Sequence, residues 1–326
     1  MNTYLCKFVV GFDPELGGEQ LRLLAISKDG EVTILDSDNS IVMPSAFVWD
    51  KEKNLLYITD EQNNGHGRVL VFSVISDKLF FLQAIPTFGS NPCHVVIDKK
   101  RCMIYVSHYS GGGIARYKLL DTGLVDVFSA DVYMRTGEFH FVLPLNEGFI
   151  ALDCGNNGVV FCAYDLQNRI IDMKFSQVSS PRQIVMDAEN HFFGVSEMES
   201  QIFDLQLNNM KIGKKVSSRI FDTTKVNTAS TLRISKDKDK VIVSNRGDNS
   251  IVVYDIYEGC LVNGRVVISD GNDCPRDFNI SNDDKFIIVS YLKSDYVYVY
   301  KLDDKWISCT FMGKIEMKAP LGVQIL

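Results

Sequence analysis

The segment PRDFNISNDDKFIIVS, residues 275–290, decides the fold, because related segments recur along the chain. Each copy opens with a short apolar strand that begins at Pro or at a residue in its place. These starts are Pro44, Pro92, Glu138, Pro181, Ala229, Pro275 and Pro320. Successive starts lie 48, 46, 43, 48, 46 and 45 residues apart. In the six complete copies, a second apolar strand reaches a small or polar residue 15 positions after the start, at Thr59, Ser107, Asp153, Ser196, Ser244 and Ser290. A period of this size, built from short strands, is typical of a β-propeller.

Each copy predicts four strands. In the first copy they are residues 45–50, 54–60, 68–74 and 79–85, separated by Gly and by Asn–Asp pairs as hairpins require. The third strand of three copies ends on a tyrosine 25 residues after the start, at Tyr117, Tyr254 and Tyr300. We expect these rings to pack between neighbouring sheets.

The two ends of the chain predict how the ring closes. Residues 319–326, APLGVQIL, form an innermost strand with nothing after it, whereas residues 4–12, 21–27 and 31–37 are three strands with no innermost strand before them. Together they complete one blade, which removes the exposed edges of an open sheet. The sequence therefore predicts an all-β, seven-bladed propeller with four antiparallel strands per blade, as one domain over residues 1–326.

Composition limits the possible partners. The chain has 326 residues, 46% of them hydrophobic and 23% charged, and a net charge of −7, which disfavours nonspecific binding to nucleic acid or anionic membranes. The first residues lack the pattern of a signal peptide, and no apolar run is long enough for a membrane span. The eight cysteines include no CxxC pair. We expect a cytoplasmic protein without disulfides.

Propeller topology brings certain positions together. The first strand of each blade starts at the face where the second strand ends, so these positions should surround the mouth of the central channel. This register places five residues from three adjacent blades near one another: His140, Arg182, Glu197, Asn245 and Arg246. Three more residues occupy the remaining arc: His94, His108 and Arg276.

A cationic rim on an acidic protein favours capture of a small anion. Arginine suits this task because its planar fork matches carboxylate and phosphate oxygens. The alternative is structural, since Arg182 and Glu197 lie across one hairpin and could simply form an ion pair.

Several segments carry a family resemblance. They are residues 91–117, 180–187, 195–200, 240–256 and 274–290, of which SNRGDNSI followed by PR is the most specific part. With them, nearly the whole chain resembles the lactonase-type seven-bladed propellers, a family that includes bacterial 6-phosphogluconolactonases and the fungal carboxy-cis,cis-muconate cyclase.

The resemblance implies an active site at the channel mouth built from a His, an Arg, a Glu and a second Arg. In this sequence these fall on His140, Arg182, Glu197 and Arg246, the residues that the repeat register also selects. We expect substrate contacts from His94, His108, Asn245 and Arg276. The reaction needs no metal and no other cofactor, and no nucleotide-binding or nucleophile-elbow motif is present.

The chain departs from the family pattern at four places. Glu138 and Gln183 stand where many relatives have His, and His108 stands where they have Asn. The aspartate-rich turn of the family is reduced to DCGNN at residues 153–157. These differences concern the shape of the substrate rather than the four-residue set.

Three functions follow as hypotheses. The first is hydrolysis of a small anionic sugar lactone, with 6-phosphogluconolactone the leading substrate and Glu197 or His140 as the base. The second is cyclisation or reopening of a carboxymuconate-type lactone, with the arginines holding carboxylates. The third is a propeller that binds a ligand or a protein without catalysis, as many propellers do.

Overall fold

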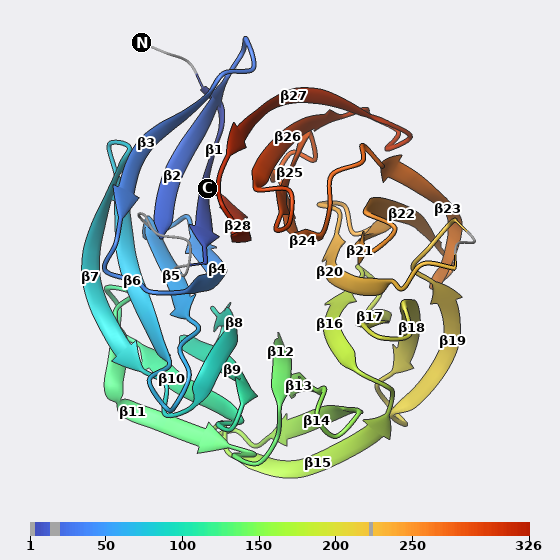
Figure 1. The fold of residues 1–326 in the computed structure, drawn as a ribbon. Coiled ribbons are helices and arrows are strands. Elements are labelled where there is room, and N and C mark those ends of the chain that lie inside the picture. Colours follow the sequence, from blue (N-terminus) through green and yellow to red (C-terminus); the bar gives the residue numbers. More distant parts are fainter. Residues whose placement is uncertain (1–3, 14–19, 222–223) are drawn as a thin grey trace.

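The chain forms a ring of seven four-stranded antiparallel sheets around a central axis (Figure 1). We analysed a computed structural model, which describes residues 4–13, 20–221 and 224–326. The predicted seven-bladed propeller is confirmed. Blade 1 contains β4 (Pro44–Asp50), β5 (Leu55–Asp60), β6 (Arg68–Ile75) and β7 (Lys78–Pro86). Blade 2 contains β8 (Ser90–Asp98), β9 (Met103–Ser110), β10 (Ile114–Leu119) and β11 (Val125–Tyr133). Blade 3 contains β12 (Phe139–Leu145), β13 (Gly148–Asp153), β14 (Gly158–Tyr164) and β15 (Ile170–Gln177).

The remaining four blades repeat this order from the axis outward. Blade 4 contains β16 (Pro181–Met186), β17 (Phe192–Ser196), β18 (Gln201–Gln206) and β19 (Lys211–Ser217). Blade 5 contains β20 (Thr228–Ile234), β21 (Lys240–Arg246), β22 (Ser250–Tyr257) and β23 (Cys260–Ile268). Blade 6 contains β24 (Pro275–Ile280), β25 (Phe286–Tyr291), β26 (Tyr296–Leu302) and β27 (Cys309–Glu316). Blade 7 contains β28 (Pro320–Ile325), β1 (Tyr4–Phe12), β2 (Leu21–Ser27) and β3 (Val32–Asp38).

Blade 7 closes the ring as the sequence predicts. The C-terminal strand β28 pairs antiparallel with β1, with Val10 opposite Val323, and β2 and β3 follow outward. The first and last parts of the described chain are thereby held in one sheet. Within the described segments, no helix is long and apolar enough to span a membrane.

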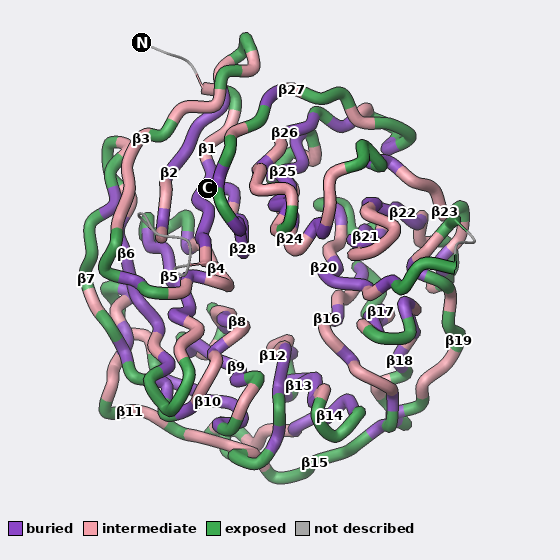
Figure 2. Tube along the Cα trace, in the orientation of Figure 1, coloured by how far each residue is buried: buried purple, intermediate pink, exposed green. Residues whose placement is uncertain are grey.

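Apolar side chains fill the space between neighbouring blades. The described residues form seven apolar clusters, and each cluster joins residues of two adjacent sheets. Figure 2 shows that buried residues concentrate along the middle strands, while the outermost strands are mostly of intermediate burial or exposed. The three third-strand tyrosines belong to these clusters. Tyr117 also donates to the carbonyl of Pro86, and Tyr254 to that of Ser217, each in the preceding blade. The predicted role of these tyrosines in packing is confirmed.

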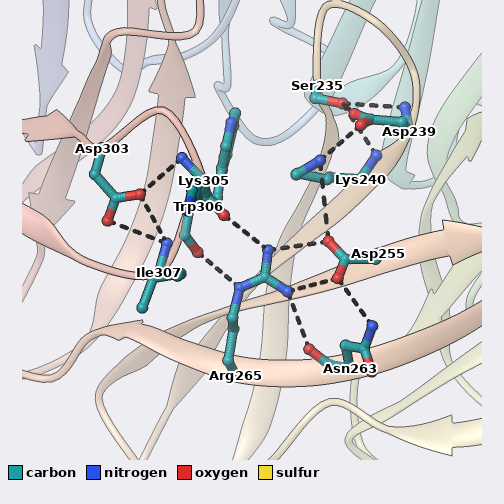
Figure 3. Close-up of polar contacts among 10 residues, drawn as sticks. All are labelled: Ser235, Asp239, Lys240, Asp255, Asn263, Arg265, Asp303, Lys305, Trp306 and Ile307. Atoms are coloured by element: carbon teal, nitrogen blue, oxygen red, sulfur yellow. Dashed lines mark hydrogen bonds and ion pairs between the residues drawn. The ribbon is translucent and has the colours of Figure 1, made fainter.

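Polar contacts also connect blades away from the axis. In Figure 3, Arg265 of β23 donates to both carboxylate oxygens of Asp255, each at 3.0 Å. Its Nε donates to the carbonyl of Trp306 in blade 6 at 2.7 Å, and further N–H groups reach the carbonyls of Asn263 and Lys305. Every part of this guanidinium has an acceptor, so Arg265 fixes the outer strand of blade 5 against a turn of blade 6.

Candidate active site

The seven innermost strands surround the centre of the ring (Figure 1), and a cavity of about 460 Å³ lies among their first residues. All seven blades contribute to its wall. Six of the eight predicted site residues line this cavity: His94, His140, Arg182, Glu197, Arg246 and Arg276. The structure therefore brings the four predicted catalytic residues into one space.

A β-bulge near the start of each innermost strand presents these side chains. In β16, Pro181 pairs with Ser196 and Gln183 pairs with Val195, so Arg182 has no partner across the ladder. Cys93, His140 and Arg276 occupy the same unpaired position in β8, β12 and β24. Because a bulge leaves one residue outside the ladder and re-aims its side chain, consecutive residues such as Arg182 and Gln183 can both face the cavity.

One carboxylate binds two arginines at the cavity wall. Glu197 Oε2 accepts from Arg182 Nη1 at 2.7 Å, and Glu197 Oε1 accepts from Nη2 of Arg246. Burial alone would raise the pKa of Glu197, but the two guanidiniums outweigh it and hold this pKa below its ordinary value. The structural ion pair that we considered as an alternative is therefore present, and it lies inside the cavity.

His140 is uncharged at neutral pH. Burial, and after it the positive charge of Arg182, lowers the pKa of this imidazole well below its usual value. Its Nδ1 is buried and has no hydrogen-bond partner among the described residues. The ring stands edge-on to Tyr109, with centroids 6.1 Å apart. Such an imidazole can donate one N–H or accept one proton, but it carries no positive charge in the resting site.

His94 is also neutral, and its tautomer follows from its contacts. Burial lowers the pKa of His94 to about 3, with a smaller contribution from Arg233. Nδ1 accepts from the backbone N–H of Val142 at 3.3 Å, so the proton resides on Nε2. The ring stacks on Phe141 with centroids 3.9 Å apart, which fixes its plane. His94 thus offers the cavity a hydrogen-bond donor in a fixed orientation.

Two further arginines line the cavity in different states. Arg233 Nη2 donates to Asp277 at 3.2 Å, and its Nη1 donates to the side-chain oxygen of Gln183 at 3.2 Å. Arg276, by contrast, has no ion pair or side-chain hydrogen bond with any residue of the described ranges, although its backbone carbonyl accepts from Ser230 Oγ at 2.7 Å. The guanidinium of Arg276 is available to an incoming anion.

Two predicted substrate-binding residues do not line the cavity. His108 is fully buried in the wall, where its Nδ1 lies 3.1 Å from the carbonyl of Gly113. Asn245 is also fully buried, and its amide group bonds to Ser218 and to Asn227. Both side chains face the protein interior rather than the channel.

His108 and Asn245 were wrongly predicted at the mouth because the hairpins formed by the first two strands of each blade differ in length by one residue. Glu197, His108 and Asn245 each lie 16 residues after the predicted start of their copy, so a constant offset of 16 residues places all three at the mouth. In the structure, Pro92 pairs with His108 and Ala229 pairs with Asn245, whereas Pro181 pairs with Ser196. The hairpin of blade 4 is one residue shorter, so Glu197 is equivalent to the residues after His108 and Asn245. Blade 3 also differs, because its first pair begins at Phe139 rather than at the predicted start, Glu138.

The corrected register adds two cavity residues that the sequence analysis missed, Glu61 and Tyr109. In each of four hairpins, the residue directly after the partner of the predicted start lines the cavity: Glu61, Tyr109, Glu197 and Arg246. Glu61 could have been found from the sequence, because it directly follows Asp60, the last residue of the second predicted strand of the first copy. Among the residues that the structure covers, no group of three or more His, Cys, Asp or Glu side chains could hold a metal ion.

Comparison with known proteins identifies relatives over the whole propeller. A family model described as lactonase, seven-bladed β-propeller, matches residues 7–325. The 6-phosphogluconolactonase of Bacillus subtilis is 23% identical over 308 residues, which cover 87% of each chain. That of Formosa agariphila is 23% identical and covers 91% of this chain and 92% of its own. Among solved structures, a periplasmic gluconolactonase of Pseudomonas aeruginosa has a TM-score of 0.84 at 20% identity, with coverage of 98% and 99%.

Proposed function

The chain belongs to the lactonase family of seven-bladed β-propellers, and from this premise we propose that it hydrolyses a phosphorylated sugar lactone, with 6-phosphogluconolactone as the leading substrate. The named relatives support lactone hydrolysis as the reaction class. The choice of a phosphorylated substrate is supported by the charges of the cavity.

The observation that carries the proposal is the excess of guanidinium groups at one end of the cavity. Arg182 and Arg246 share a single carboxylate, Glu197, and the guanidinium of Arg276, whose charge acts on Arg246, has no described partner. The positive charges of Arg182 and Arg276 both act on His140, and those of Arg182 and Arg276 also act on Arg246, so the groups share one electrostatic environment. A dianionic phosphate would relieve this repulsion and would receive charge-assisted hydrogen bonds.

Each group has a role that its contacts support. Arg276 binds the phosphate. Arg182 lies beside His140 and stabilises the negative charge that develops on the lactone carbonyl oxygen when water attacks. Neutral His140 donates a hydrogen bond to the departing ring oxygen. His94, with its proton on Nε2, binds a sugar hydroxyl.

Glu197 acts as a positioning residue in this scheme. Both of its oxygens are occupied by arginines, and its pKa is depressed, so it is a poor proton acceptor. Its function is to hold Arg182 and Arg246 in a fixed separation across blades 4 and 5. This preorganisation costs nothing at the moment of reaction.

The test is a comparison of three lactones in a proton-release assay at neutral pH. The substrates are freshly prepared 6-phosphogluconolactone, unphosphorylated gluconolactone and a carboxymuconolactone, with spontaneous opening subtracted for each. We expect the highest kcat/KM for the phosphorylated lactone. Preference for the carboxylated lactone would contradict the proposal and favour the cyclase-type function.

A binding function without catalysis gives a different pattern. In that case 6-phosphogluconate raises the melting temperature, because a ligand that binds only the folded state stabilises it, while none of the three lactones opens faster than in buffer. That combination would also contradict the proposal.

A further inference from the structure

We propose that Glu61 is the general base that activates water in this cavity, an inference that rests on the lactone hydrolysis proposed above. Three carboxylates line the cavity: Glu61, Glu197 and Asp277. Two of them are engaged. Glu197 binds Arg182 and Arg246, and Asp277 binds Arg233, the hydroxyl of Thr231 at 2.8 Å and the backbone N–H of Val323 at 3.0 Å.

Glu61 differs from both. No residue of the described ranges forms an ion pair or a hydrogen bond with its carboxylate, although the side chain lines the cavity. A general base needs a lone pair that is not already shared with a cation or a donor. Among the three carboxylates, Glu61 alone meets this requirement in the part of the chain that the structure describes.

The backbone holds Glu61 firmly at the mouth. It follows β5 directly, and its N–H donates to the carbonyl of Met43 at 2.9 Å. The next residue, Gln62, accepts from the N–H of Asn91 at 2.8 Å, which ties the segment to blade 2. The preceding residue, Asp60, is fully buried and binds Arg68. Glu61 is therefore a free carboxylate on a fixed backbone rather than a residue on a long loop.

Glu61 also lies on the His140 side of the cavity. The negative charge of Glu61 is, after burial, the main influence that raises the pKa of the Cys93 thiol. The same thiol donates to the carbonyl of Phe139 at 3.3 Å and contacts that of His140 at 3.7 Å. Glu61, Cys93 and His140 thus follow one another along blades 1, 2 and 3, so a water bound near Glu61 can approach a lactone whose ring oxygen faces His140.

The other nucleophilic or basic groups of the cavity are less suited. Burial raises the pKa of Cys93, which leaves the thiol protonated and bonded to a carbonyl. His94 has its Nδ1 occupied by a backbone N–H and its Nε2 protonated. His140 is needed as a donor to the leaving oxygen.

The proposed step balances as follows. One O–H bond of water breaks, its proton moves to the Glu61 carboxylate, and the oxygen forms a bond with the lactone carbonyl carbon. The ring C–O bond of the tetrahedral intermediate then breaks, and the ring oxygen takes a proton within the site, by way of His140, as Glu61 returns to its ionised form. The product carboxyl group ionises, which releases one proton to solvent for each lactone opened.

The test measures kcat and KM for Glu61→Gln with 6-phosphogluconolactone. Removing a general base typically costs a factor of about 10²–10⁴, so we expect kcat to fall at least about 100-fold while KM changes little, because Arg276 still binds the phosphate. Glu61 makes no described side-chain bond, so the melting temperature should not change. Glu52→Gln, on an exposed turn of the same blade, is the matched control and should behave as wild type.

Chemical rescue separates a base from a structural residue. In Glu61→Ala, added formate should restore part of the lost turnover, because a small carboxylate can occupy the vacated space and accept the proton. Turnover by Glu61→Gln equal to that of wild type, or a loss in Glu61→Ala that formate does not relieve, would overturn the inference. Absence of turnover in wild type would instead contradict the proposed function itself.

Discussion

Two arginines on neighbouring blades show how similar residues serve different purposes. Arg265 donates to five acceptors and binds blade 5 to blade 6. Arg276, on the innermost strand of blade 6, faces the cavity with no described partner for its guanidinium. A folded protein usually satisfies the donors of a partly buried arginine. A guanidinium left without acceptors in a cavity is therefore a good indicator of ligand binding.

The first prediction concerns Arg276. Replacement by Ala removes charge-assisted hydrogen bonds to the phosphate, which are worth about 1.5–3 kcal/mol each, so KM for the phosphorylated lactone should rise about 10- to 100-fold. The unphosphorylated lactone should be affected far less. Steady-state kinetics on both substrates measure this difference. Arg169→Ala, in an exposed turn of blade 3, is the control. An equal loss on both substrates would contradict phosphate binding by Arg276.

The second prediction concerns Glu197. Glu197→Gln leaves Arg182 and Arg246 without their shared counter-charge, and breaking a buried pair in this way costs about 3 kcal/mol of unfolding free energy. The folded pKa of Glu197 is depressed, so its stabilising contribution is fully present above its unfolded pKa of about 4.3 and is lost as pH falls through the folded value. Urea unfolding of both proteins at pH 7 and at pH 3.5 should show a large difference in stability at pH 7 and a smaller one at pH 3.5. A difference that stays constant would exclude an ionised Glu197 as the cause.

At the scale of elements, the strand pattern was predictable and the site only partly so. The alternation of apolar and polar residues, the turn residues between strands and the period of 43 to 48 residues depend on local chemistry, which a sequence displays directly. The side-chain direction at the mouth depends on the hairpin register, and a shift of one residue turns a side chain to the opposite face. Glu197 was selected correctly because blade 4 has the shorter hairpin, and His108 and Asn245 were selected because their hairpins were assumed to be equal to it.

The third prediction tests the contact between two elements, β23 and the blade 6 turn. Arg265→Ala removes hydrogen bonds to Asp255 and to the carbonyls of Trp306 and Lys305, and we expect the unfolding free energy to fall by about 1.5–3 kcal/mol. Urea unfolding measures this loss. Turnover of the lactone should be unchanged, since Arg265 lies away from the cavity. Arg265→Lys should be more stable than Arg265→Ala but less stable than wild type, because an ammonium group cannot reproduce the planar, forked arrangement of the guanidinium donors. Full recovery by lysine would show that charge alone matters at this contact.

At the scale of the whole molecule, the burial of histidine side chains inside the closed ring makes the free energy of unfolding depend on pH. The terminal strands β28 and β1 share one sheet, so the ring has no open end in its described part. Three of the five histidines lie inside this closed structure, and burial lowers the pKa of His94 to about 3, that of His108 to about 4 and that of His140 well below its usual value.

The fourth prediction follows from these histidines. Their folded pKa values lie below the unfolded value of about 6.5, so below that pH the unfolded chain binds more protons and stability falls as the solution becomes more acidic. Three groups that stay neutral in the folded state give a slope of about 4 kcal/mol per pH unit near pH 5. Urea unfolding between pH 7 and 5 measures this slope. His94→Asn should reduce it by about a third, whereas His66→Asn, at an exposed turn, should not. If the unfolding free energy of wild type, His94→Asn and His66→Asn changed equally with pH, the buried histidines would not be the cause of the pH dependence.

The most direct measurement is proton release from freshly prepared 6-phosphogluconolactone at pH 7, with wild type and Arg182→Ala compared after spontaneous opening is subtracted. The predicted result is rapid release with wild type and a rate close to that of buffer with the variant, because Arg182 binds Glu197 and its positive charge acts on the neutral imidazole of His140. Release with wild type no faster than in buffer would contradict lactone hydrolysis at this site.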